Sequence, residues 1–179
     1  MPLQCLVYIG QGTFAHGVIE KYTSFSEAVT MELAHSYLEK GHNITMDNYF
    51  TTFALADRLL GKNTTMVGTL RHNKREIPPA AKCVTNRNRG DSKHYYNGNR
   101  TICSFWDKSN KPVLLLSTMH GCQVDTGDGK PAIVSYYNST KSGVDTLDKL
   151  VRMFRSKRKC RRWPYSIFLH AWMSLLFRI

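Results

Sequence analysis

Acidic residues are few in this sequence, and the charge is unevenly placed. Lys and Arg outnumber Asp and Glu 25 to 13, so the formal net charge is +12. Residues 71–111 hold ten basic and three acidic side chains, and residues 152–162 hold seven basic and none acidic, which leaves the remainder near neutral. Positive charge concentrated in two places indicates a polyanion partner, with nucleic acid ahead of an anionic membrane surface. The alternative is two solvated loops.

Cysteines and long hydrophobic segments are also scarce. The five cysteines are widely spaced and form no C-x-x-C pair, so the sequence predicts neither a zinc site nor a disulfide framework and fits a reducing compartment. The first residues lack the basic, apolar and cleavage regions of a secretory signal. The apolar run 165–177 contains Ser and His and is shorter than the roughly 20 residues of a membrane span. We therefore expect a core helix beginning at Pro164 and no membrane association.

Enough apolar residues are nevertheless present for a folded core. The 179 residues, 42% of them hydrophobic, suit one globular domain or one domain with a small insertion. The first part of the chain alternates between strand-like and helix-like patterns, which predicts an α/β layer with some parallel pairing. We expect strands at 3–9, 14–20, 43–46 and 65–70, a helix from the capping box Ser24–Glu27 to Gly41, and a helix capped by Thr51 or Thr52 that ends at Gly61.

The pattern changes after Arg71, where prolines and a basic, Asn-rich run interrupt the alternation. Two β-like stretches follow, and we interpret the whole segment as a small, basic, largely β insertion. The core then returns with an expected strand and a helix whose apolar positions repeat at helical spacing. The segments behind this interpretation are the basic run 86–100, the β-like stretches 101–106 and 112–119, the turn 125–129, the strand 132–137 and the helix opening at Ser142 and Gly143.

Three aspartates stand where such a fold places functional acids. Asp47 directly follows the expected strand 43–46, and α/β sheets usually bind ligands and metals at the carboxyl ends of strands. Asp145 and Asp148 open the expected helix after Gly143. The alternatives are structural, because Asp47 is equally suited to cap a helix and acids in a first turn are favoured by the helix dipole.

Four motifs, in their order and spacing, resemble the piggyBac family of DDE/D transposases and the transposase-derived proteins related to it. The resemblance covers essentially the whole chain, and several long motifs in one order are far more specific than any short pattern. The motifs are N-I-T-M-D-N-Y-F-T-T (43–52), M-V-G-T-L-R-H-N-K-R-E-I-P (66–78), Y-Y-N-S-T-K-S-G-V-D-T-L-D (136–148) and R-R-W-P (161–164).

The resemblance implies both a fold and a chemistry. It implies an RNase H-like mixed sheet with flanking helices, interrupted by an insertion domain, and cut-and-paste DNA transposition at TTAA targets. In the family three Asp carboxylates hold two divalent ions for phosphodiester transfer, and Mg²⁺ prefers such oxygen ligands. By motif match Asp47 is the second metal-binding acid and Asp145 the third, so both are expected catalytic and metal-binding residues. Asp148, three residues on along the same helix face, is an expected assisting acid.

One acid of the family's triad has no counterpart. No Asp precedes Asp47, and Glu20, Glu27, Glu32 and Glu39 do not fall at the motif position. A site short of one ligand holds its metals poorly, because the remaining carboxylates repel each other. We therefore expect a fragment of a transposase catalytic domain that is inactive as it stands. The alternatives are a non-catalytic, transposase-derived DNA-binding protein and a functionless transposon relic.

Double-stranded DNA is the expected partner. Phosphates attract clustered basic side chains without reading sequence, and Trp163 suits either stacking on an unpaired base or packing on the next helix. Asn48 suits a DNA contact or an Asx turn. Arg87, in the insertion, is expected to line a backbone groove beside Tyr95 and Tyr96, aromatics that suit the insertion's own core. The predicted DNA-binding residues are Asn48, Arg71, Lys74, Arg75, Arg152, Arg155, Lys157, Arg158, Lys159, Arg161, Arg162 and Trp163.

The resemblance also sets expected boundaries and cellular context. It implies a nuclear protein, homodimers among full-length relatives and no small-molecule substrate. The expected segments are the first part of the RNase H-like core (1–73), the insertion domain (74–131), the second part of the core (132–155) and the start of a helical dimerisation and DNA-binding region (156–179).

Overall fold

The structure is a computed structural model. The chain forms two compact units, and residues from 141 onward belong to a different unit from residues 24–140. We call residues 24–140 the sheet unit and describe each unit by itself. The residues that the structure describes are 24–83, 87–107, 112–121, 125–126, 129–154, 164, 165 and 168.

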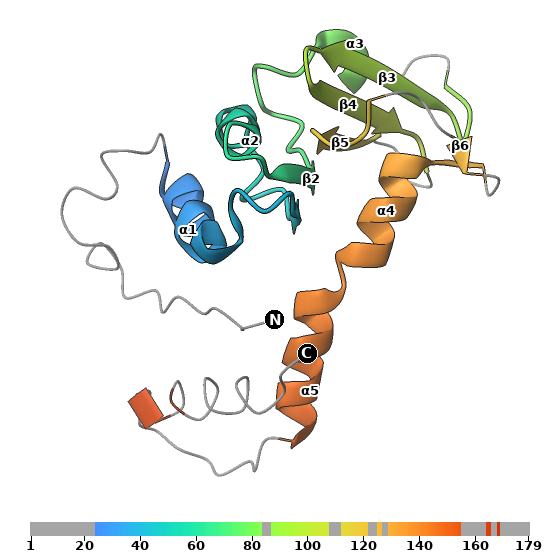
Figure 1. Cartoon of the computed structure of the whole chain (residues 1–179). Coiled ribbons are helices and arrows are strands. Elements are labelled where there is room, and N and C mark those ends of the chain that lie inside the picture. The colour runs from blue at the N-terminus through green and yellow to red at the C-terminus, as the bar shows by residue number, and fades with distance from the viewer. Residues whose placement is uncertain are drawn as a thin grey trace. The chain divides into compact units, whose positions relative to one another are not determined.

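Helices and strands alternate from α1 to β2, as expected for the first part of the chain, and five strands follow one another after α3 (Figure 1). Its helices are α1 (Phe25–Ala34), the 3-10 helix η3 (His35–Tyr37), α2 (Phe53–Leu60), the short α3 (Pro79–Lys82) and α4 (Ala132–Thr140). Its strands are β1 (Asn43–Met46), β2 (Thr65–Thr69), β3 (Ser92–Asn97), β4 (Arg100–Phe105), β5 (Val113–Ser117), β6 (Asp125–Thr126) and β7 (Lys130–Pro131). The other unit contains α5 (Gly143–Phe154).

Five strands form one mixed sheet in the order β1-β2-β5-β4-β3, and β6 pairs with β7. Strands β1 and β2 are parallel, with Thr45 opposite Val67, whereas β2–β5, β5–β4 and β4–β3 are antiparallel. The predicted α/β class, a mixed sheet with flanking helices, is confirmed.

The strands expected in the insertion pair with the main sheet. Strands β3, β4 and β5 lie side by side and extend the sheet that β1 and β2 begin (Figure 1). Strand β3 falls in the run that composition alone marked as basic and Asn-rich. Its pairing with β4, from Ser92 opposite Phe105 to Asn97 opposite Arg100, turns that polar run into a strand. The domain boundaries proposed from the sequence stay predictions.

Each face of the sheet buries its own core. One core joins α1, α2 and α3 to the sheet through large apolar side chains, among them Leu55, Leu59, Met66 and Leu116. The other core joins α4 to the opposite face. Apolar side chains alternate between the two faces along β2 and β5, so this part of the sheet is covered on both sides, as in a three-layer α/β arrangement.

The expected helix starts are observed. The Ser24 hydroxyl accepts from the Glu27 amide at 3.3 Å, and the Thr52 hydroxyl accepts from the Leu55 amide at 3.1 Å, so Thr52 rather than Thr51 caps α2. The capping-box acid has a further role, because the fully buried Glu27 pairs with Arg58 Nε at 2.8 Å. This pair links α1 to α2.

The prediction of a strand at 132–137 is wrong, since these residues belong to α4. The run A-I-V-S-Y-Y is rich in β-branched and aromatic residues, and short apolar runs of this kind do not separate strand from helix by periodicity. Tertiary packing decides the conformation here. Ile133 and Val134 are buried, and Tyr136 and Tyr137 pack against the same core.

The carboxyl half of α4 is hydrogen-bonded to β1. The Tyr136 hydroxyl donates to Asn43 Oδ1 at 3.3 Å, and the Thr45 hydroxyl donates to that of Thr140 at 2.9 Å. Asn43 in turn donates to the Thr65 hydroxyl at 2.9 Å. The end of α4 is therefore tied to the strand that leads to Asp47.

A Ser–His contact lies between α4 and the end of β5. The buried Ser117 hydroxyl oxygen accepts from the amides of Met119 and His120, each at 3.1 Å, and lies 2.8 Å from His120 Nδ1. Because the oxygen already accepts two N–H groups, we assign its proton to the bond toward Nδ1. The Tyr136 ring packs edge-on against the imidazole, with centroids 5.5 Å apart. Burial lowers the pKa of His120 from its ordinary value of 6.5.

Some predicted elements fall outside the described residues. These are the strands 3–9 and 14–20, most of the helix expected after Pro164, and the basic run at residues 155–162 with Trp163. None of the described helices has both the length and the apolar character needed to cross a membrane.

We predict that His120 makes the fold sensitive to acid. The pKa of His120 is lower in the folded chain than in the unfolded chain. At a pH between these two pKa values the unfolded chain binds more protons, so the free energy of unfolding falls as the pH drops through about 6.5. NMR titration of the ring should give a value below 6.5. Urea unfolding of His120→Asn should show a smaller loss of stability on acidification, whereas the exposed His42→Gln control should follow the wild type. An unshifted His120 titration contradicts the prediction.

Candidate functional site

The candidate site begins where β1 and β2 end. These strands are parallel, so their carboxyl ends meet at one edge of the sheet, where ligands of α/β sheets usually bind. Asp47 directly follows β1, and Arg71 follows β2 by two residues. The sheet thus brings an acid and a base from two separate motifs to the same edge.

Asp47 is held by a hydrogen-bonded turn. Its main-chain carbonyl accepts from the amides of Phe50 and Thr51, each at 3.1 Å, and from the Thr51 hydroxyl at 2.9 Å. The cap of α2 is Thr52, so the alternative in which Asp47 caps that helix is wrong. The Asp47 carboxylate remains exposed, and its Oδ1 accepts from the Asn48 amide.

Gly68 makes room for this turn. Thr51 is fully buried over β2, and a Cβ at Gly68 would overlap Thr51 Oγ1 and lie 2.9 Å from the Met46 carbonyl oxygen. Only glycine allows the turn to approach the strand this closely. Gly68 and Thr51 therefore determine where the Asp47 carboxylate lies at the sheet edge.

Asn48, Tyr49 and Arg71 form a polar and aromatic cluster beside Asp47. Arg71 Nε donates to Asn48 Oδ1 at 3.2 Å, and the Arg71 guanidinium lies 5.3 Å from the centroid of the Tyr49 ring. All three side chains are exposed. The structure thus unites two predicted DNA-binding residues, Asn48 and Arg71. The Asn48 carbonyl oxygen accepts from a side chain of the second motif, a contact that the Asx-turn alternative did not anticipate.

The other described basic residues of the second motif and the insertion differ in role. Arg75 is exposed, and Lys74 is half-buried on the loop that also carries Arg71. The expectation that Arg87 lines a DNA groove is wrong, because its buried guanidinium donates to the Ser104 hydroxyl at 2.7 Å and to main-chain oxygens. Tyr95 packs against the core that α1, α2 and α3 share with the sheet, so it is a core residue but not part of a separate core of the insertion.

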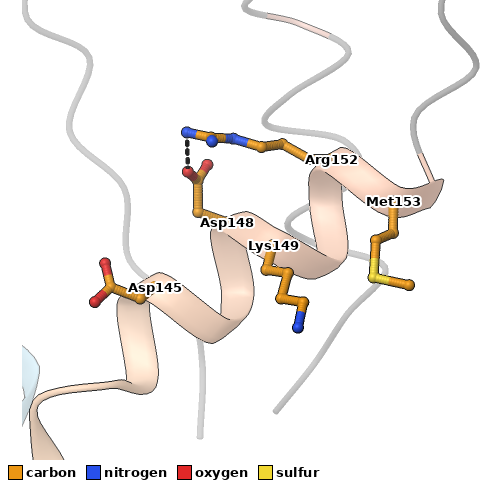
Figure 2. A pocket seen from close by; sticks show the side chains of 5 residues that line it. All are labelled: Asp145, Asp148, Lys149, Arg152 and Met153. Carbon is orange, nitrogen blue, oxygen red and sulfur yellow. Dashed lines mark ion pairs between the residues drawn. The ribbon is translucent and has the colours of Figure 1, made fainter.

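The second pair of predicted acids lies on α5. Asp145 is in the first turn of the helix and is exposed. Asp148 pairs with Arg152 at 2.6 Å, and the two side chains point to one side of the helix (Figure 2). An open hollow beside α5 is lined by Asp145, Asp148, Lys149, Arg152 and Met153. The predicted assisting acid thus neutralises a predicted DNA-binding base.

The donor chemistry of these residues suits a hard divalent cation. Asp47 and Asp145 each present an exposed carboxylate, the ligand that Mg²⁺ prefers together with water. Within the described ranges, no three His, Cys, Asp or Glu side chains gather in a group able to hold a metal. The remaining predicted DNA-binding residues, Arg155 to Trp163, lie outside those ranges.

Comparison with known proteins decides the family. A family model described as Transposase IS4 matches residues 3–177, nearly the whole chain. The chain belongs to this transposase family. Within it, the chain resembles piggyBac proteins, which confirms the resemblance based on the four motifs.

Three piggyBac relatives of this transposase chain illustrate the likeness. Human PiggyBac transposable element-derived protein 3 is 25% identical over 167 residues, a match that covers 85% of this chain and 27% of the relative. The human Chimeric ERCC6-PGBD3 protein is also 25% identical, over 85% of this chain and 15% of its own length. The cryo-EM structure of a piggyBac transposase synaptic complex with hairpin DNA matches with a TM-score of 0.83 and 37% identity. That match covers 94% of this chain and 34% of the solved chain.

Sequence reasoning missed three residues of the candidate site. Thr51 was considered only as a helix cap, and neither Gly68 nor Tyr49 was assigned a role. The signal for Gly68 was present, because a glycine inside a strand often marks a close backbone approach. Tyr49 gave no such signal, since an aromatic residue between Asp47 and a helix suits a core position equally well.

We predict that Gly68→Ala destabilises the sheet unit and disturbs the Asp47 turn. The added methyl group must either push the buried Thr51 aside, which breaks the hydrogen bond from Thr51 to Asp47, or strain the strands. Overpacking of this kind lowers the free energy of unfolding by about 1–3 kcal/mol. Urea unfolding measures the loss. Gly121→Ala is the matched control, because its Cβ meets open space and should change stability by less than about 0.5 kcal/mol. Equal midpoints for Gly68→Ala and wild type would exclude the close approach.

Proposed function

We propose that this transposase chain binds double-stranded DNA across the sheet edge at Asp47 and holds Mg²⁺ through Asp47 and Asp145. The observation that carries the proposal is the assembly of Asp47, Asn48 and Arg71 at the carboxyl ends of two parallel strands. An acid held there by backbone hydrogen bonds, next to an exposed guanidinium, suits a phosphodiester with its counter-ion. The proposal that Asp145 binds the same ions as Asp47 rests on the motif match with the family.

The proposed metal ions supply Lewis-acid chemistry: a pair of divalent cations, when bound, stabilises the attacking and leaving oxygens of a phosphodiester displacement. The chain's own residues have simpler roles. The Asp47 turn orients one carboxylate, and the Asn48–Arg71 bond orients a guanidinium toward the same edge. Arg71 then neutralises phosphate charge, which positions DNA without reading its sequence.

A third acid is needed for the full triad of a DDE/D site. The residues before Asp47 include no aspartate. We therefore propose that these 179 residues bind DNA and Mg²⁺ but do not cut DNA by themselves, and that strand transfer requires an acid from elsewhere.

DNA as the partner is supported by two independent facts. The net charge of +12 is concentrated in two segments, and the matching piggyBac transposase structure is of a synaptic complex with hairpin DNA. We also propose a nuclear location, as the resemblance to the piggyBac family implies. The second candidate function is a DNA-binding role without metal, supported by the concentrated positive charge, which attracts phosphates without a bound cation.

We predict a steep salt dependence for DNA binding. If six to ten phosphates are neutralised, the affinity should fall by about 10³- to 10⁵-fold between 50 and 200 mM salt, because counter-ions are released on binding. Fluorescence anisotropy of a labelled duplex measures this. Arg71→Gln should reduce the slope of log K against log salt by about 0.9, the loss of one phosphate contact.

Lys40→Gln is the control for this experiment. Lys40 precedes β1 and so lies toward the opposite edge of the sheet, where its ammonium donates to the Ser36 carbonyl oxygen at 2.6 Å. Its removal should leave the slope unchanged. If the DNA affinity of the wild type does not change with salt, the DNA-binding proposal is overturned. If Arg71→Gln and Lys40→Gln change the slope equally, DNA does not bind at the Asp47 edge.

A further inference from the structure

Tyr49 is an exposed aromatic residue in the candidate site that no assigned role explains. Its side chain is 49% exposed, although its neighbour Phe50 packs on the core. The two rings meet edge to face, with centroids 5.0 Å apart. The Arg71 guanidinium lies over the Tyr49 ring. These two π-bearing groups from separate strand ends therefore form one stacked, exposed surface.

The turn that holds Asp47 also makes this surface rigid. Tyr49 lies inside the segment closed by the hydrogen bonds from Phe50 and Thr51 to the Asp47 carbonyl. Arg71 is fixed from its other side by the bond to Asn48 at 3.2 Å. A preorganised surface loses little conformational entropy when a ligand binds, which favours a binding role over incidental exposure.

We propose that Tyr49 and Arg71 form a stacking platform for an unpaired DNA base beside Asp47. Aromatic rings and guanidinium planes are the groups on which proteins stack splayed bases, and such stacking is tolerant of base identity. The inference rests on the proposed function, since it names the part of DNA that the site takes.

An unpaired base fits this platform better than a duplex does. In a duplex the faces of each base are covered by neighbouring bases, so a side chain reaches them only where a strand ends or is distorted. Asp47 is two residues away from Tyr49, so a base held on the platform leaves its own phosphate near the proposed metal-binding carboxylate. The platform therefore selects a strand end or a flipped nucleotide.

The test compares two DNA probes of equal length: a blunt duplex and a duplex with a single-stranded overhang carrying 2-aminopurine. The full chain should favour the overhang probe and quench its 2-aminopurine fluorescence. Tyr49→Leu, which keeps an apolar side chain but removes the ring, should lower the overhang-to-blunt affinity ratio by about tenfold and abolish the quenching. Tyr49→Phe should keep both, because stacking does not need the hydroxyl.

Tyr96→Leu is the matched control. Tyr96 is 52% exposed on β3, the strand at the opposite edge of the sheet from β1. Its substitution should leave the overhang-to-blunt affinity ratio unchanged. The inference is overturned if Tyr49→Leu, folded as judged by its unfolding curve, keeps the wild-type ratio, or if Tyr96→Leu loses as much. If the wild type binds neither probe, the proposed function fails with it; if it binds both probes equally, only the stacking platform fails.

Discussion

The close contact between Thr51 and β2 is the constraint on which the candidate site depends. The Thr51 hydroxyl donates to the Asp47 carbonyl oxygen from a fully buried position that exists only because Gly68 has no side chain. The same turn delivers the chain to the Thr52 cap of α2. One packing detail thus sets the end of β1, the start of the next helix, the direction of the acid and the placement of Tyr49.

The elements around Asp47 were predictable because local signals and tertiary packing agree there. A short apolar run, a capping residue and a terminal glycine specify β1, α2 and the turn after it, and the structure has all three. Agreement fails at α4, where β-branched residues favour a strand locally but Ile133 and Val134 pack on the sheet as a helical face. It also fails at β3, whose polar sequence forms a strand because β4 offers a complete edge.

The candidate site was predictable in its residues but not in its contacts. Motifs identify Asp47, Asn48 and Arg71 separately, yet only the parallel pairing of β1 and β2 brings the last two within hydrogen-bonding distance. The number of basic residues in a segment does not distinguish one arginine from another. The structure separates them: Arg87 stabilises the fold from a buried position, Arg152 is paired with Asp148, and Arg71 is exposed at the sheet edge.

The proposal on which the functional conclusion depends is that Asp47 and Asp145 hold the same divalent cations, as the motif match with the family implies. NMR with Mn²⁺, a paramagnetic substitute for Mg²⁺, tests it most directly, because broadening falls steeply with distance from the ion. If the proposal holds, the amide signals of Asn48 and Thr146 broaden together at the same Mn²⁺ concentration, and Asp47→Asn weakens the effect at both while the exposed control Glu76→Gln does not. Broadening at only one of the two positions, or at neither, would contradict it.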